Sequence, residues 1–302
     1  MFLACDYNIT SSPNYTHICI YNINMYFGIL LLVILSICIF VYYRLTKIEC
    51  FEPAIGAETN QSVNVIVSRY NEKLAWTKKA PYNKYKYIVY NKGTNDDFEK
   101  KYISNVLKLP NVGRESHTYL YHIVNNYDNL ADINVFLPGS IDTNHKVFKK
   151  HNFATKLLNY IEKYKNAVFL SFGNIKENDI TQEFHNFKVD AYSSTTAENR
   201  KQNAEYAIRK SQFRPFQTWL HNNIGSEKVP YVIHYGIFSV NKKDILKKPK
   251  SYYEKLLKLV SDHSNPEDGH YFEKSWGAVF YPLNNTHVVL DPDVVDPFKG
   301  RY

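Results

Sequence analysis

The sequence contains no cysteine after residue 50; its four cysteines are Cys5, Cys19, Cys38 and Cys50. The longer part of the chain therefore has no disulfide, no thiolate nucleophile and no cysteine-based zinc site. Cys5 and Cys19 could pair in an oxidising compartment, which the sequence alone leaves open. Any role of cysteine is confined to the first 50 residues.

Long runs of basic residues are also absent, although the formal charge is +8 at pH 7. The lysines are scattered in short pairs such as Lys78–Lys79 and Lys242–Lys243, and no nucleic-acid-binding motif is present. This pattern indicates a solvated basic surface, and we expect no nucleic-acid partner. A nucleotide phosphate would also suit a basic domain, but net charge cannot identify one.

One stretch lacks charged residues altogether, since residues 26–43 have the sequence YFGILLLVILSICIFVYY. A helix of this length can cross the ~30 Å hydrocarbon layer, and Tyr26, Tyr42 and Tyr43 lie where interfacial aromatic residues are usual. A cleaved signal peptide fits less well, because a basic start and a nearby small-residue cleavage site are missing. The sequence therefore predicts a single-pass membrane protein that contacts the lipid bilayer through residues 26–43.

The orientation of this segment in the membrane stays open. Arg44 and Lys47 follow it and no Lys or Arg precedes it, which favours an exterior N-terminus and a cytosolic main domain. Glycosylation sequons support either orientation, because they lie on both sides of the segment, at Asn8, Asn14, Asn60 and Asn284.

The predicted organisation has four parts: a short N-terminal segment (1–25), a transmembrane helix (26–43), a stem (44–61) and a globular domain (62–302). Strands are expected near 63–67, 85–90, 133–137, 167–170, within 229–240, and near 287–290. Helices are expected after 110–115, at 153–164, near 197–210, after Pro249 and after 264–268. Strands that alternate with helices predict an α/β fold with a mostly parallel sheet flanked by helices.

Ligands of such a sheet bind beyond the carboxyl ends of its strands, which directs attention to residues 68–72, 91–93 and 138–145. In the first of these turns, Arg69 could fork onto a phosphate, and Asn71 and Glu72 could hold a base or ribose. Alternatively, these side chains only cap the next structural element.

Arg114 stands at the opening of a predicted helix, where free N–H groups and the helix dipole favour an anion. A salt bridge between Arg114 and the neighbouring Glu115 is the alternative interpretation. Both interpretations place charge at the start of this helix.

Asp142 and His145 combine a carboxylate and an imidazole three residues apart, and could hold a divalent cation that binds a diphosphate. The literal Asp-x-Asp of the chain, Asp291–Asp293, is more typical of a polar tail. His270 and Glu273 share one face at the start of the last helix. Glu273 could act as a general base on a hydroxyl, although its charge also suits a helix N-terminus.

Five segments, taken together and in order, resemble an uncharacterised family defined only as a domain of unknown function, with members mainly in fungi and some large viruses. The likeness covers roughly residues 63–282. The segments are VIVSRYNEKLAW (65–76), PNVGRESHTYLYHI (110–123), NYDNL (126–130), VFLPG (135–139) and GHYFEKSW (269–276).

That family in turn looks like the nucleotide-sugar glycosyltransferases that have a single Rossmann-like domain of the glycosyltransferase A type. Residue by residue, the resemblance implies that Arg69, Asn71 and Glu72 contact the nucleotide. It also implies that Asp142 and His145 replace the motif that holds Mn²⁺ or Mg²⁺, since an Asp-x-Asp is absent from 137–142.

The same resemblance makes Glu273 the catalytic base and likens the segment from Gly236 to Asn241 to the acceptor side of those enzymes. Membrane-anchored enzymes of this kind commonly have a lumenal catalytic domain. We therefore expect a membrane-anchored glycosyltransferase that moves a sugar from a nucleotide-sugar donor to a hydroxyl acceptor. The alternative is a non-catalytic single-pass membrane protein, for example a viral one, that uses the same fold as an interaction module.

Overall fold

The computed structural model describes residues 28–38, 61–142, 150–172, 184–190, 208–233 and 235–291. The chain forms two separate units, Met1–Thr59 and Asn60–Tyr302. In the first unit, residues 28–38 are helical, and no helix within the described ranges has both the length and the apolar character needed to span a bilayer. The predicted segment 26–43 extends beyond the described residues at both ends, and the predicted parts 1–25 and 44–60 lie outside them.

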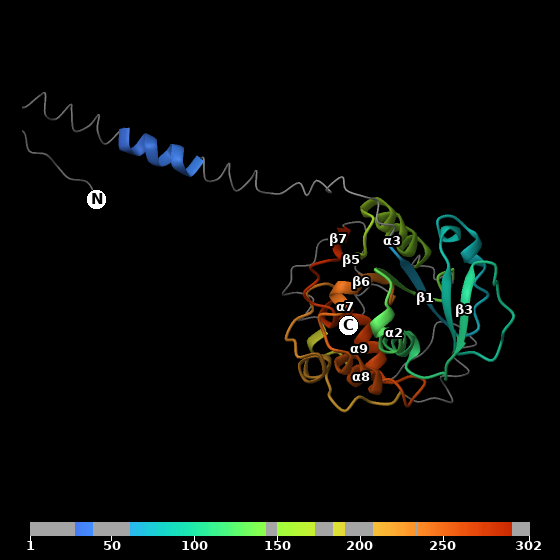
Figure 1. Ribbon diagram of the computed structural model, residues 1–302. Helices are drawn as coiled ribbons and strands as arrows, with labels where there is room; N and C mark the ends of the chain where they lie inside the picture. The colour runs from blue at the N-terminus through green and yellow to red at the C-terminus, as the bar shows by residue number, and fades with distance from the viewer. Residues whose placement is uncertain are drawn as a thin grey trace, which may run out of the picture. The chain divides into compact units, whose positions relative to one another are not determined.

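A five-stranded sheet with strand order β3-β2-β1-β4-β6 forms the centre of the second unit (Figure 1). The first four strands are parallel, and β6 is antiparallel to β4. The prediction of an α/β fold with a mostly parallel sheet is thus confirmed. The strands are β1 (Val63–Arg69), β2 (Tyr87–Asn91), β3 (Ile103–Lys108), β4 (Ile133–Pro138) and β6 (Phe238–Asn241).

A second, two-stranded parallel sheet consists of β5 (Val168–Phe172) and β7 (His287–Asp291). One side chain links it to the large sheet. The Ser239 hydroxyl of β6 accepts a hydrogen bond from the Val168 backbone N–H and donates one to the Val168 carbonyl, each at 2.7 Å. Ser239 is fully buried, so no water replaces these bonds.

The apolar run in β1 is continuous because both faces of the sheet are covered. Ile66 belongs to the hydrophobic cluster on one face, whereas Val65 and Val67 belong to the cluster on the other face. All three side chains are buried. Successive side chains of a strand point to opposite faces of the sheet, so the apolar residues of β1 contribute to two separate hydrophobic clusters.

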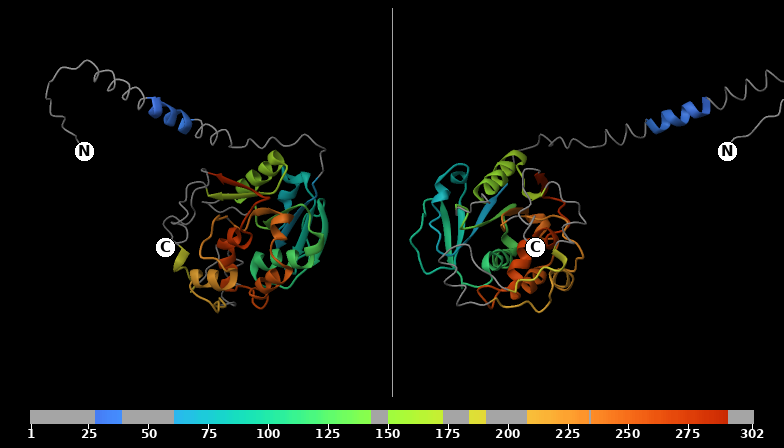
Figure 2. Two further views of the ribbon diagram at one scale, coloured as in Figure 1. Left: turned by 60° about the vertical axis from the view of Figure 1, so that its left-hand side comes forward. Right: turned by 180° about the vertical axis from the view of Figure 1, so that it is seen from behind.

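Helices cover both faces of the sheet. On one side, α2 (Arg114–Asn125) packs against α8 (Lys250–Lys258) and α9 (Glu267–Val279), and these three gather together in Figure 2. The other hydrophobic cluster receives the apolar side chains of α3 (Lys150–Tyr164). The short elements are η1 (Ala75–Lys78), η2 (Tyr82–Lys84), η3 (Tyr127–Asn129), α6 (Phe216–Trp219), η4 (Leu220–Ile224) and α7 (Lys242–Ile245).

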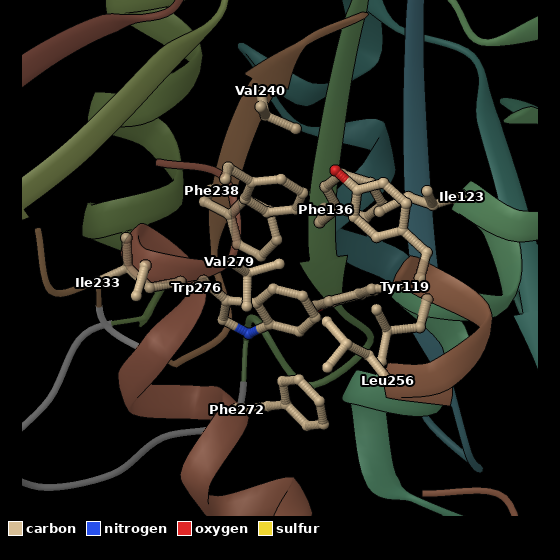
Figure 3. Close-up of a cluster of buried hydrophobic side chains, with 14 of the residues drawn as sticks. Tyr119, Ile123, Phe136, Ile233, Phe238, Val240, Leu256, Phe272, Trp276 and Val279 are labelled. Carbon is tan, nitrogen blue, oxygen red and sulfur yellow. The ribbon is translucent and has the colours of Figure 1, made fainter. Parts of the chain in front are cut away.

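Four aromatic side chains, Tyr119, Phe136, Phe238 and Trp276, form an aromatic cluster between the sheet and the helices (Figure 3). The ring centroids are 4.9 Å apart for Phe136 and Phe238, 5.0 Å for Tyr119 and Phe136, and 5.1 Å for Phe238 and Trp276. Contacts of this kind bury large apolar areas and favour specific ring geometries. The cluster therefore ties α2 and α9 to β4 and β6.

Two sequence expectations differ from the structure. The strand β3 was not predicted, because most of its residues are exposed and it shows no apolar alternation. In the expected strand region 229–240 only the last part is a strand. Val229, Val232 and Ile233 are buried without strand pairing, because apolar side chains can fill a core from irregular backbone as well. Most of the expected helix at 197–210 lies outside the described residues.

Replacing Ser239 by alanine should lower the free energy of unfolding by about 1–3 kcal/mol, because the buried Val168 N–H loses its partner. The measurement is chemical denaturation of the full-length protein in detergent. Ser104→Ala is the matched control, since the Ser104 hydroxyl also bonds a backbone carbonyl, that of Tyr87, but on an exposed strand. The control should stay within about 0.5 kcal/mol of the wild type, and equal effects of the two changes would contradict the prediction.

Candidate active site

The strand order of the large sheet changes direction between β1 and β4. From β1 the chain places β2 and then β3 on one side, and it then returns to place β4 on the other side of β1. In open parallel sheets, ligands bind outside the carboxyl ends of the strands at such a reversal. The turns at this position are 69–72, after β1, and 138–142, after β4. Two of the three turns selected from the sequence are thus neighbours.

Glu72 joins these two turns. Its Oε2 accepts a hydrogen bond from the Tyr70 backbone N–H at 2.7 Å, and a Cβ atom on Gly139 would lie only 2.8 Å from the same oxygen. The Gly139 N–H donates to the Ser68 carbonyl at 2.7 Å, and its carbonyl accepts from the Trp76 indole at 3.0 Å. This close approach favours glycine at position 139.

Arg69 lies fully buried beneath the turn after β1. Its Nε donates to the Glu72 carbonyl at 2.8 Å, and its Nη1 donates to Asn91 Oδ1 and to the Asn95 carbonyl, each at 2.6 Å. Its Cζ lies 4.0 Å from the centre of the Phe98 ring, and burial lowers the pKa of the guanidinium from its usual value. Through these contacts Arg69 holds the turns after β1 and β2 in place. Its contact with a phosphate stays a prediction.

Asn71 is exposed at the tip of the same turn. Its Oδ1 accepts from the Asn95 N–H at 3.4 Å, and a Cβ atom on Gly93 would lie 2.4 Å from that oxygen and 1.7 Å from the Tyr70 carbonyl oxygen. The turns after β1 and β2 are therefore in direct contact. Asn71 presents a donor and an acceptor to solvent at their junction.

Lys92 follows β2 and forms hydrogen bonds with the backbone at the start of α2. Its Nζ donates to the Val112 carbonyl at 2.5 Å and also to the Arg114 carbonyl. Gly113 and Arg114 have left-handed backbone angles, with φ of 60° and 51°. Burial lowers the pKa of Lys92 to about 7, against the charge of Glu115, which raises it. Sequence reasoning selected the 91–93 turn but gave Lys92 no role.

Lys150, the first residue of α3, lies at the carboxyl end of β4, because its Nζ donates to the Ser140 hydroxyl at 3.0 Å. Burial lowers the pKa of Lys150, and the charges of Glu115, Glu273 and Glu72 raise it. Sequence reasoning did not identify this lysine. Its only signal was its place after a loop that follows a strand.

The charges of Glu72, Arg114, Glu115 and Glu273 all act on Lys150, although these five residues come from four separate segments of the chain. We call them the charged cluster. Glu72 comes from the turn after β1, Lys150 from α3, Arg114 and Glu115 from α2, and Glu273 from α9. The predicted nucleotide-binding residues Glu72 and Arg114 and the predicted base Glu273 are therefore brought together.

Arg114 and Glu115 form the ion pair that was the alternative expectation, with 3.9 Å between Nε and Oε2. Both side chains keep part of their surface exposed, 26% and 17%, so they remain accessible to a ligand. The charges of Glu115 and Glu273 also act together on Tyr119, whose pKa is raised well above its usual value, chiefly by burial. A carboxylate of α2 and a carboxylate of α9 thus act on the same buried tyrosine.

His270 and Glu273 differ in their surroundings. His270 is buried, and its Nε2 makes a 3.0 Å hydrogen bond with Asn265 Oδ1. Burial lowers the pKa of His270 far below its usual value, and the charges of Arg114 and Lys274 lower it further. Glu273, one turn later, is only partly buried. The carboxylate is therefore the better placed of the two to meet a substrate.

The predicted metal site is described only in part. Asp142 is exposed, and His145 lies outside the described residues. Across the described stretches, no group of three or more His, Cys, Asp or Glu side chains is arranged to hold a metal ion. Mn²⁺ and Mg²⁺ take several oxygen ligands, so metal binding by Asp142 and His145 stays a prediction, and no step below depends on a metal.

Comparison with known families adds one finding. Residues 65–290 match the model of a family described as "Protein of unknown function (DUF3431)". Comparison with curated proteins finds no match. The matched range contains the whole charged cluster.

The stability of the domain should rise with pH between about 7 and 10, because Lys92 and Lys274 have pKa values lowered by burial to about 7 and about 8. In this range the unfolded chain binds more protons than the folded one, so the free energy of unfolding increases, by at most about 1.4 kcal/mol per pH unit for each lysine. Denaturation of the full-length protein at a series of pH values measures this slope.

Lys92→Met should reduce the slope, because one of the lysines whose pKa is lowered by burial is then absent from both states. Lys163→Met, at an exposed position of α3, is the matched control and should keep the wild-type slope. Equal slopes for Lys92→Met and the wild type would show that Lys92 does not titrate in this way.

Proposed function

We propose that this chain, which belongs to this family of proteins of unknown function, is a membrane-anchored glycosyltransferase. It would move a sugar from a nucleotide-sugar donor to a hydroxyl acceptor. The observation that carries the proposal is the charged cluster at the reversal of strand order between β1 and β4. Mostly parallel sheets bind nucleotides at such a reversal.

The turns after β1 and β2 suit the nucleotide part of the donor. Asn71 is exposed where the two turns meet, and its amide can both donate to and accept from a base or ribose. Glu72 is held by the Tyr70 N–H, so its second oxygen can accept from a ribose hydroxyl. Arg69 acts here as a positioning residue, because its guanidinium is buried below the turn.

In the proposed reaction, the Glu273 carboxylate takes the proton of the acceptor hydroxyl. The acceptor oxygen bonds to the anomeric carbon of the donor sugar, and the bond from that carbon to the diphosphate oxygen breaks. The electron pair stays on the leaving nucleoside diphosphate, whose charge Arg114 stabilises. His270 has no step in this reaction, because its side chain is buried and its Nε2 is already hydrogen-bonded to Asn265 Oδ1.

The acceptor side is supported by the position of Gly236. This residue has a φ of 64°, and a Cβ atom on it would lie 3.2 Å from Glu115 Cγ. The segment before β6 therefore meets the charged cluster directly. This placement agrees with the likeness of the Gly236–Asn241 segment to the acceptor side of glycosyltransferases.

Glu273→Gln should lower kcat for sugar transfer, or for donor hydrolysis, by about 10²–10⁴-fold, because a general base is lost while the shape is kept. Release of nucleoside diphosphate from a panel of nucleotide sugars, measured with full-length protein and with or without Mn²⁺, is the assay. Glu254→Gln, on the exposed face of α8, should leave the rate unchanged. If the wild type releases no nucleoside diphosphate from any donor, the proposal fails and a non-catalytic role is favoured.

The full-length protein should remain in the membrane pellet after alkaline carbonate extraction, because residues 26–43 are apolar over a bilayer-spanning length. Replacing both Leu32 and Leu35 by lysine should release it, since each central lysine costs about 2.5–3.5 kcal/mol of insertion free energy. Wild-type protein that appears in the carbonate supernatant would contradict the anchor.

A further inference from the structure

Lys150 is the one cation of the charged cluster that is attached to the end of β4. Its Nζ donates a hydrogen bond to the Ser140 hydroxyl at 3.0 Å, and Ser140 is the second residue after the end of β4. The Tyr235 ring centre lies 5.8 Å from the same Nζ. The ammonium is therefore held by neutral partners at the position where the sheet reverses its strand order.

The carboxylates around Lys150 act on it only from beyond ion-pair distance. Glu72, Glu115 and Glu273 act on it through their charges, but among the described residues none forms an ion pair with it within 4.0 Å. Desolvating an ammonium is costly unless a counter-charge lies close to it. A phosphate oxygen bound beside Ser140 would supply that counter-charge.

Within the described residues, lysine is the cation that the protein itself supplies at this point. No group of three metal-ligating side chains exists within the described ranges, and Asp142, the one predicted ligand that is described, is exposed. A leaving diphosphate still needs positive charge as the bond to the sugar breaks. Arg114 and Lys150 are the two cations of the charged cluster, and they lie on different helices.

We propose that Lys150 replaces a divalent cation in this protein, so that the leaving nucleoside diphosphate is bound and stabilised by Lys150 and Arg114 and transfer proceeds without a metal. The inference rests on the proposed function and deepens it. The bonds that form and break are those given above, and the ammonium keeps its proton throughout. It contributes a charge-assisted hydrogen bond that strengthens as negative charge develops on the diphosphate.

The test is calorimetric binding of UDP, GDP, ADP and CDP to the full-length protein in detergent, in EDTA and separately in Mn²⁺. At least one of these nucleoside diphosphates should bind wild type with the same Kd in both buffers. Lys150→Met should weaken that binding by about 10- to 100-fold and lower kcat by about 10²–10³-fold. Lys150→Arg, which keeps the charge, should recover most of the binding.

Lys163→Met, on the same helix but exposed, is the matched control and should bind as wild type does. Thermal unfolding of each variant shows whether it is folded, and Lys150→Arg separates loss of charge from loss of packing. Binding that requires Mn²⁺, or a Lys150→Met variant that binds in EDTA like the wild type, would overturn the inference alone. Absence of binding in both buffers would overturn the inference together with the proposed function.

Discussion

Packing of the aromatic cluster holds the two functional helices side by side. Phe136 and Phe238 stack across β4 and β6, and Tyr119 and Trp276 extend this contact to α2 and α9. Because Arg114 and Glu115 begin α2 and Glu273 lies in the second turn of α9, the positions of these three residues follow from apolar packing further along the same helices. An interior packed at this density allows little adjustment, so the geometry of the site is set by the core beneath it.

Around that core, the protein buries several charges at once. Lys92 is enclosed by the backbone at the start of α2 and Arg69 by the turns after β1 and β2, while the charges of Glu72, Glu115 and Glu273 act on Lys150. Such burial costs stability and is tolerated when opposite charges and hydrogen bonds compensate for it. A site whose charges are already desolvated and oriented can stabilise developing charge without reorganisation, which connects the cost in stability to the proposed catalysis.

The outline of the site could be predicted from the sequence, because the carboxyl ends of buried strands mark it. Glu72 was selected in this way, Arg114 from the start of a predicted helix and Glu273 from the face of the last helix, and all three lie in one charged cluster. Lys92 and Lys150 escaped notice, since a single lysine in a lysine-rich chain looks like any solvated one. Arg69 was selected for its chemistry, whereas its burial, which depends on Asn91 and Asn95 from another turn, has no signature in its own segment.

The sequence by itself determined the α/β class, most of the strands and the order in which polar turns follow them, because periodicity and turn chemistry are local properties. It could not show that β4 returns to the far side of β1, or that α9 lies against α2, because pairing and packing join residues far apart in the chain. Only the tertiary structure decided which polar side chains are buried and hold backbone turns in place, and which belong to the charged cluster. The reason is that burial, and with it the charge state of lysine, histidine and arginine, exists only after the layers have closed.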